Sequence, residues 1–287
     1  MKSLSSYFQR LFAAPLPADS VAELVRSRRL NAAFQPIINL QTANIRGHEA
    51  FVRCSAGHAL SQGHELLQAA KQERFQRDFE LACVEYAIVG WGRQHRQGQL
   101  FINITARSLV QLESEMGPGR LSQLLEEQCV PAPRIVFEIT EHSNFDRLPE
   151  LVVAANRLRS LGASIAMDDV KGSEGSLHVW LQLVPDLVKL DKRLTTGVHQ
   201  DPVKHRVIQS LVKLAAKCGN TMVAKSVETA DDLRALRDLG IDFAQGYFLG
   251  SPDASPNDLL NQRARGVISE NWAPRKKEYW FNAPYSV

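Results

Sequence analysis

The runs AFQPIINL, at residues 33–40, and IRGHEAFVRC, at residues 45–54, decide the fold of this chain. Apolar, β-branched and aromatic residues dominate both runs, which is typical of β-strands. Only four residues, 41–44, separate them. A parallel connection needs roughly a dozen residues for its crossover, whereas antiparallel strands can be joined by a short turn. We therefore predict that the two runs form an antiparallel hairpin.

Similar short runs recur along the chain, and longer segments with helical spacing lie between most of them. The predicted strands are residues 33–40, 45–54, 99–105, 134–140, 164–170, 187–191, 220–226 and 242–248. The predicted helices include residues 74–96, 148–161, 202–218 and 230–239. In these helices apolar residues recur at positions i, i+3, i+4 and i+7. Several strands are almost wholly apolar, as are strands that are covered on both faces of a parallel sheet.

Eight strands with helices between most of them predict an α/β protein, a (β/α)₈ TIM-like barrel with one antiparallel strand. A doubly wound open sheet is the alternative, but no glycine-rich phosphate loop follows the first strand. Residues 255–265 are expected to form a short closing helix. We divide the chain into an N-terminal amphipathic segment (1–19), a barrel domain (20–265) and a C-terminal tail of aromatic and basic residues (266–287).

Composition narrows the class of protein. The 287 residues include 34 Lys and Arg and 31 Asp and Glu, giving a net charge of +3. This balance gives no ground for general binding to DNA, RNA or a membrane surface, although the aromatic and basic tail keeps nucleic-acid binding open as an alternative. The four cysteines form no C-x-x-C pair, which indicates reduced thiols of a cytoplasmic protein. No run reaches the roughly 18 apolar residues of a transmembrane segment.

Polar residues follow one another at the predicted strand ends. They are Glu49, Asn103, Glu138, Glu141, Asp168, Asp169, Lys189, Glu228 and Gln245. The carboxyl ends of barrel strands converge on one mouth, where the active sites of this fold lie. Several carboxylates there would repel one another unless cations compensate them. Oxygen ligands without Cys or His suit Mg²⁺ or Mn²⁺, and two such ions about 4 Å apart can clamp a phosphodiester and activate water.

Eight runs of this sequence resemble the EAL domain, in order and at the family's spacing, from about residue 20 to 262. They are FQPIIN (34–39), HEAFVR (48–53), FINIT (101–105), FEITE (137–141), IAMDD (165–169), PDLVKLD (185–191), VET (227–229) and QGYFLGSP (245–252). The name-giving triplet reads Glu49-Ala50-Phe51, which departs from the family at its third position. EAL domains are cyclic di-GMP phosphodiesterases of bacterial signalling, and degenerate relatives bind the nucleotide or protein partners without hydrolysis.

The resemblance implies a role for each matching residue. Glu49, Asn103, Glu138 and Asp168 match the ligands of a first Mg²⁺ or Mn²⁺. Asp168 and Asp169 match the residues that reach a second ion, and Lys189 matches the lysine that positions the attacking water. The expected catalytic residues are thus Lys189, Asp169 and Glu228. Gln35, Arg53 and Gln245 match positions that contact the phosphates and bases of the nucleotide.

Two segments depart from the family pattern. The seventh strand of the family ends AEGVET, whereas residues 224–229 read AKSVET, so Lys225 replaces the glutamate that serves the second metal and the attacking water. A protonated lysine cannot ligate a metal and repels Mg²⁺. The loop DDFGTGYSSL is altered to DDVKGSEGSL at residues 168–177. The resemblance therefore implies that one divalent-ion site is kept and that the second is damaged.

Two functions follow as hypotheses. The first is a non-hydrolytic or weakly hydrolytic regulator that binds cyclic di-GMP or a protein, and we favour it because a two-metal displacement needs both ions. The alternative is an active metal-dependent phosphodiesterase that converts cyclic di-GMP to linear pGpG. A protein partner and a homodimer are left open. We also expect Lys225 to lie within about 4 Å of Asp168 or Asp169 and to stand in for the second cation, the alternative being that it points to solvent.

Overall fold

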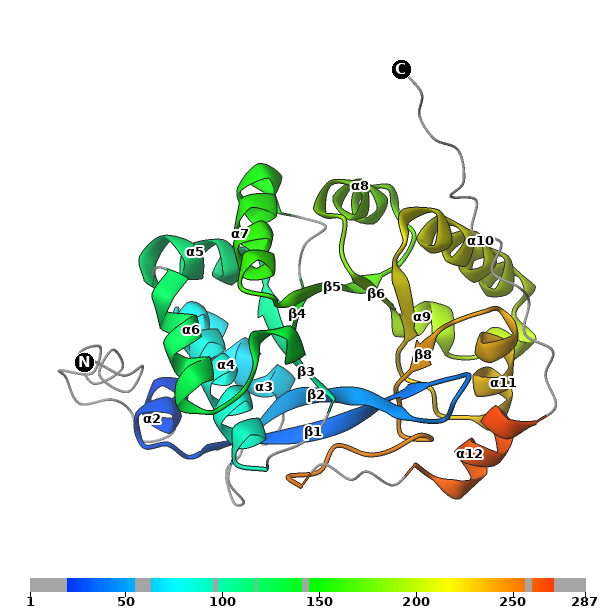
Figure 1. The fold of residues 1–287 in the computed structure, drawn as a ribbon, viewed down its shortest axis with the longest axis horizontal. Coiled ribbons are helices and arrows are strands. Elements are labelled where there is room, and N and C mark those ends of the chain that lie inside the picture. The colour runs from blue at the N-terminus through cyan, green and yellow to red at the C-terminus, as the bar shows by residue number, and fades with distance from the viewer. Residues whose placement is uncertain are drawn as a thin grey trace.

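The computed structural model of this chain describes residues 20–54, 63–94, 98–116, 118–140, 145–255 and 260–270. Its strands are β1 (Leu30–Asn39), β2 (Ile45–Cys54), β3 (Gln99–Thr105), β4 (Ile135–Thr140), β5 (Ser164–Val170), β6 (Leu187–Leu190), β7 (Thr221–Ala224) and β8 (Phe243–Ala244). They close into one barrel in the order β1 to β8 (Figure 1). The predicted barrel is confirmed.

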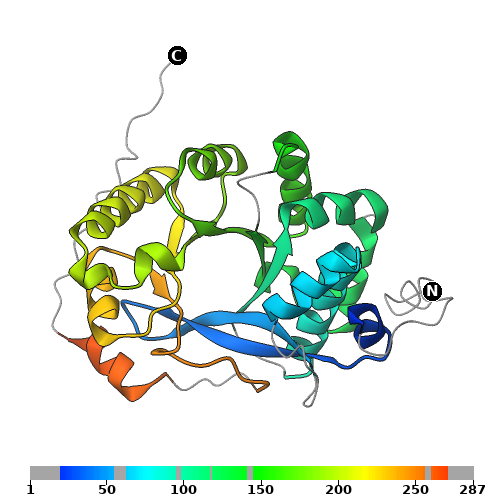
Figure 2. The same cartoon turned by 180° about the vertical axis from the view of Figure 1, so that it is seen from behind.

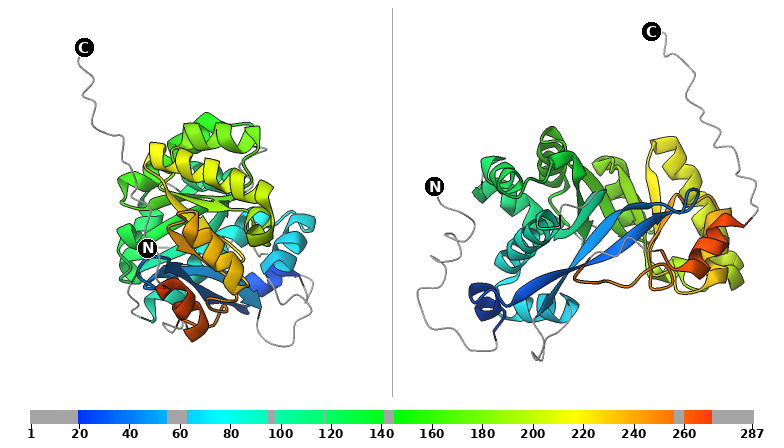
Figure 3. Two further views of the ribbon diagram at one scale, coloured as in Figure 1. Left: turned by 90° about the vertical axis from the view of Figure 1, so that its right-hand side faces the viewer. Right: turned by 60° about the horizontal axis from the view of Figure 1, so that its bottom comes forward.

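The hairpin that starts the barrel is antiparallel, as its short connection predicts. β1 and β2 pair from Leu30 opposite Cys54 to Ile38 opposite Ile45, with one register shift at Ile37. β1 also pairs antiparallel with β8, and every other neighbouring pair is parallel. β1 is therefore the single reversed strand. The right-hand view of Figure 3 shows β1 and β2 as a long twisted ribbon along one side of the barrel.

Helices cover the outside of the remaining strands (Figure 2). They are α2 (Val21–Arg26), α3 (Gly63–Gln72), α4 (Gln76–Gly92), α5 (Ala106–Met116), α6 (Pro118–Glu127), α7 (Leu148–Ser160), α8 (Glu174–Leu183), α9 (Lys192–Thr195), α10 (Pro202–Cys218), α11 (Ala230–Asp238) and α12 (Gln262–Ser269). Local sequence signals set several bounds. For example, Asp201 caps the start of α10, and Gly219, with φ of 72°, ends it. No helix in the described ranges is long and apolar enough to cross a membrane.

Strands β7 and β8 are shorter than their apolar runs predict. The chain leaves the ladder after Ala224, and Ser226 adopts a left-handed conformation with φ of 54°. The backbones that follow the two strands then cross closely, with the amide of Val227 donating to the carbonyl of Gln245. A side chain on Gly246 would lie 2.2 Å from backbone atoms of Val227. Tertiary contact, not strand propensity, therefore sets the end of both strands.

A closing helix was expected at residues 255–265, and the structure places it further along the chain; residues 256–259 of the expected range lie outside the described residues. α12 runs over Gln262–Ser269, because Asn261 caps its first turn by accepting from the amide of Arg263. Arg234 of α11 pairs with Glu270, and Arg237 donates to the carbonyl of Val267, so the helix is tied to α11. α12 therefore extends across the domain limit drawn at residue 265. The N-terminal segment (1–19) and residues 271–287 of the tail lie outside the described residues.

The barrel interior is filled by one apolar layer. It consists of Ile37, Phe101, Val136, Ala166, Leu187 and Val223, against which Phe243 packs. Six strands contribute one residue each. β2 contributes no side chain at the matching level, where Gly47 lies beside Gln99 of β3. The layer separates the bottom of the barrel from its mouth.

We predict that Gly47→Ala destabilises the protein. A methyl group there would lie 2.1 Å from the carbonyl oxygen of Gln99, so β2 and β3 would have to separate. Overpacking of this kind costs about 1–3 kcal/mol, which urea unfolding would detect as a lower midpoint. Gly266→Ala is the matched control, because nothing lies within 4 Å of that site in α12. The control should gain up to about 1 kcal/mol, and equal midpoints for both variants would contradict the prediction.

Candidate functional site at the barrel mouth

The polar mouth lies directly above the apolar layer. Alternate residues of a strand face the same side, so the residue two positions closer to the mouth faces inward as well. The residues at these positions are Gln35, Asn103, Glu138, Asp168, Lys189, Lys225 and Gln245, and Glu49 of β2 joins them. The structure therefore brings together most of the side chains that the sequence assigned to the site.

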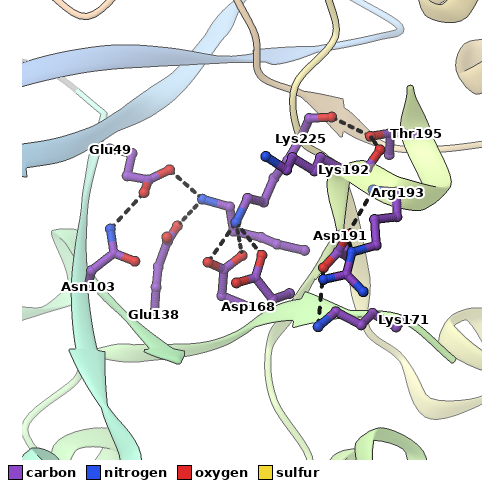
Figure 4. Close-up of polar contacts among 12 residues, drawn as sticks. Glu49, Asn103, Glu138, Asp168, Lys171, Asp191, Lys192, Arg193, Thr195 and Lys225 are labelled. Carbon is purple, nitrogen blue, oxygen red and sulfur yellow. Dashed lines mark hydrogen bonds and ion pairs between the residues drawn. The ribbon is translucent and has the colours of Figure 1, made fainter. Parts of the chain in front are cut away.

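A fully buried lysine lies at the centre of the mouth. The Nζ atom of Lys189 is 2.6 Å from Oε2 of Glu49 and 2.6 Å from Oε1 of Glu138. Asn103 donates from Nδ2 to the other oxygen of Glu49 at 2.6 Å (Figure 4). The ring of Phe101, from the apolar layer, has its centroid 5.9 Å from the same Nζ atom. Lys189 thus bridges acids from β2 and β4.

Lys225 bridges a second pair of acids. Its Nζ atom donates to both carboxylate oxygens of Asp168 at 2.7 Å and to Oδ1 of Asp169 at 2.8 Å (Figure 4). The expectation that Lys225 lies within about 4 Å of these residues is confirmed. Consecutive strand residues would normally face opposite sides, but Asp169 has φ of 54°. This turn of the backbone lets both carboxylates reach the same ammonium group.

The backbone of Lys225 is held by a residue that the sequence did not single out. Thr195, the last residue of α9, is buried and donates its hydroxyl to the carbonyl of Lys225 at 2.6 Å (Figure 4). Asp191 begins α9 by accepting from the amide of Arg193. No motif marks Thr195, because the contact joins the end of α9 to a segment 30 residues further along the chain. The only available signal was its position shortly after the sixth strand.

Burial and the lysines set the pKa values around Lys189. Burial would raise the pKa of Glu49, but Lys189 and Lys225 hold it at about 2. Burial raises the pKa of Glu138 well above its usual range, and the charge of Glu49 adds to this shift. Burial acts to lower the pKa of Lys189, but Glu138 and Glu49 raise it above its ordinary value. Lys189 therefore stays charged, while Glu138 takes up a proton more readily than an exposed glutamate.

The Lys225 cluster follows the same physics. Burial raises the pKa of Asp168, and the ammonium of Lys225 opposes this shift. Burial acts to lower the pKa of Lys225, but Asp168, Glu49 and Asp169 raise it above its ordinary value. Lys225 is therefore protonated at neutral pH. It cannot serve as a base or lend a lone pair to a metal while it is protonated.

Two glutamines form the polar wall on the β1 side. Gln245 donates to Oε1 of Gln35 at 3.0 Å, and Gln35 donates to the carbonyl of Gly250 at 2.9 Å. Both side chains are buried. The Oε1 atom of Gln245 has no hydrogen-bond partner among the described residues. This wall therefore offers an unused acceptor.

Other assigned residues lie apart from the two lysine clusters. Glu228 is exposed, and none of the site contacts in the described part of the chain involves it. Arg53 donates to the carbonyl of Val52 at 3.0 Å and lies over the ring of Phe51, 5.6 Å from its centroid. Its guanidinium group therefore has a platform at the end of β2. Glu141 lies outside the described residues.

The acids of the mouth do not fit a two-metal centre as they are arranged. No group of three or more His, Cys, Asp or Glu side chains within the described ranges could hold a metal ion. Lys225 engages both oxygens of Asp168, and Lys189 stands between Glu49 and Glu138. One oxygen of Glu138, Oε2, is buried without a hydrogen-bond partner among the described residues. The ammonium groups of Lys189 and Lys225 thus take the place that divalent metal ions would need.

Comparison with known proteins places this geometry in a family. Residues 18–252 match the family model for the EAL domain. The cyclic di-GMP phosphodiesterase RocR of Pseudomonas aeruginosa is 28% identical over 247 residues, which cover 83% of this chain and 62% of RocR. An uncharacterized protein of Azorhizobium caulinodans is 27% identical over 259 residues, which cover 87% of this chain and 34% of that protein. The chain thus spans less than two thirds of the length of either relative.

A solved structure supports the same assignment. The manganese/cy-diGMP complex of BlrP1 from Klebsiella pneumoniae is 25% identical, with a TM-score of 0.70 and coverage of 78% of this chain and 56% of that one. The family match extends over more than 80% of the sequence and includes the residues of the barrel mouth. This chain therefore belongs to the EAL domain family.

Proposed function

We propose that this chain binds cyclic di-GMP as a regulator in bacterial signalling and hydrolyses it slowly or not at all. The contact of Lys225 with Asp168 and Asp169 carries the proposal, because it sets an ammonium group where the resemblance implies a second metal ion. Membership of the EAL family and the similarity to a phosphodiesterase, RocR, support the choice of nucleotide.

We propose that the nucleotide is held by the two glutamines of the polar wall and by Arg53. Arg53 projects a guanidinium group from the end of β2, and such a group can bind a phosphate through two parallel hydrogen bonds. The free Oε1 atom of Gln245 can accept from an N–H group of a base. Gln35 fixes the orientation of Gln245 through their hydrogen bond. These three residues are polar or charged and do not belong to either lysine cluster.

In this arrangement the site lacks a second positive group that could stabilise the charge developing on the phosphate during hydrolysis. An ammonium group has three N–H donors, and Lys225 directs all of them at carboxylate oxygens. It therefore has no donor left for a developing charge on phosphate. Loss of one such stabiliser costs roughly 10²–10³ in rate. Lys189 keeps a third donor beyond its contacts with Glu49 and Glu138, so we propose that it can still orient a water molecule.

We propose that at most one divalent ion, Mg²⁺ or Mn²⁺, serves this site. Glu49, Asn103, Glu138 and Asp168 are the residues that would hold it. Lys189 would have to release its two acids first. Asp169 and Glu228 are then left without the catalytic role that the resemblance implies, since one is paired with Lys225 and the other is exposed.

The alternative function is an active phosphodiesterase that releases linear pGpG. All residues of the first metal site and Lys189 are present, which favours this alternative. A non-hydrolytic regulator instead needs a protein partner, or a second copy of the chain, that responds when cyclic di-GMP is bound. We propose that either protein acts in the cytoplasm, where its free cysteines stay reduced.

Calorimetric titration with cyclic di-GMP tests the proposal. We expect saturable binding in EDTA and in Mg²⁺, and chromatography of the mixture should find no linear dinucleotide above the buffer control. Turnover at about 1–10³ s⁻¹ would establish the alternative. Gln245→Leu should weaken binding about tenfold, which corresponds to about 1.4 kcal/mol. Gln209→Leu, on α10, is the matched control, and absence of binding by the unmodified protein would refute the proposal.

We predict that repair of Lys225 alone does not create a phosphodiesterase. The loop after Asp169 also differs from the family, and Lys171 within it pairs with Asp191 at 3.5 Å. Linear pGpG should appear only when Lys225→Glu is combined with FGTGYS at residues 170–175. The loop replacement without Lys225→Glu is the control. Activity of the single variant Lys225→Glu would show that the loop is not needed.

A further inference from the structure

We propose that Lys225 is a built-in replacement for a divalent cation, so that this chain binds one ion fewer than a variant with a carboxylate at that position. The inference concerns the protein without nucleotide and does not depend on the proposed function. It rests on the contacts of Lys225, on the burial of its partner Asp168 and on the way the backbone of Lys225 is held.

The ammonium group of Lys225 is saturated with hydrogen-bond acceptors. Its three donors meet three carboxylate oxygens, at 2.7, 2.7 and 2.8 Å. An ion at the same place would need these oxygens as ligands, because hard divalent cations are bound by oxygen. Each oxygen of Asp168 keeps a further lone pair, but an ion at the place of the ammonium group would clash with the Nζ atom of Lys225 and be repelled by its charge. The lysine and the ion therefore exclude each other.

The carboxylates of Asp168 and Asp169 need positive charge close by. The side chain of Asp168 is only 4% exposed, and Asp169 adds a second carboxylate to the same Nζ atom. A buried carboxylate without a partner is unfavourable, because water no longer compensates its charge. Lys189 is already engaged by Glu49 and Glu138. Lys225 is thus the cation that compensates Asp168 and Asp169.

Hydrogen bonds hold the backbone at Lys225 and at the residues that follow it. Thr195 donates to the carbonyl of Lys225, and Ser226 turns the chain with a left-handed φ of 54°. The next residue, Val227, donates to Gln245 and accepts from Phe248. The side chain therefore starts from a position held on both sides, and it is only 21% exposed. This is unlike a surface lysine that is free to move aside for an ion.

Counting bound Mn²⁺ by electron paramagnetic resonance tests the proposal, with no nucleotide present. We expect Lys225→Glu to bind one more Mn²⁺ per chain than the unmodified protein. Lys213→Glu makes the same charge change on the exposed side of α10 and should leave the stoichiometry unchanged. Equal stoichiometry and affinity for the unmodified protein and Lys225→Glu would overturn the proposal, because Lys225 would then yield its place to an ion.

Thermal unfolding of Lys225→Met provides a test that remains available if Lys225→Glu does not fold. In EDTA the variant should melt about 2–8 °C below the unmodified protein, because Asp168 and Asp169 lose their counter-charge. Excess Mn²⁺ should raise its melting temperature by more than it raises that of the unmodified protein. Lys213→Met is the control and should behave as the unmodified protein does. If Lys225→Met has the same melting temperature as the unmodified protein in EDTA, the proposal that Lys225 replaces a divalent cation is refuted.

Discussion

Burial of several carboxylates at one barrel mouth requires positive charge close by. Glu49, Glu138 and Asp168 are almost fully buried, and Asp169 lies beside them. Their mutual repulsion would be severe in a region that water hardly reaches. Two lysines meet this requirement by dividing the acids into pairs, with Lys189 on one pair and Lys225 on the other. The arrangement of the mouth follows from this division.

The barrel positions these charges through the two-residue period of its strands. An apolar residue of each contributing strand lies in the interior layer, and the polar residue two positions on lies in the mouth, as Val136 and Glu138 of β4 illustrate. The apolar layer keeps water away from the underside of the charges, which strengthens each ion pair. Glu138 and Lys189 lie 51 residues apart in the chain, on β4 and β6, yet the barrel holds their charged atoms at 2.6 Å. The packing of the apolar layer and the pairing of the acids with the two lysines therefore stabilise each other.

An ammonium group lies at the end of β7, where the family resemblance implies a carboxylate, and the two groups differ in their chemistry. A divalent cation can polarise a phosphate and activate water, whereas a lysine with all three donors engaged only neutralises charge. The hydrogen bond between Gln35 and Gln245 involves neither Lys225 nor the aspartates that it contacts. A barrel mouth of this kind can thus keep its shape and its polar wall while it gives up the charge arrangement of a two-metal reaction.

The sequence by itself determined the barrel, the reversed first strand and most of the residues of the mouth, because strand periodicity and a four-residue connection are local properties. It also indicated that Lys225 meets the aspartates, since opposite charges were expected at converging strand ends. Only the tertiary structure decided that Lys189 is shared by Glu49 and Glu138 and that Thr195 holds Lys225. It also set Glu228 apart, ended β7 and β8 early and placed α12 at Gln262–Ser269. These features depend on contacts between segments far apart in the chain, and no local pattern of residues encodes which of several acids a buried lysine will pair with.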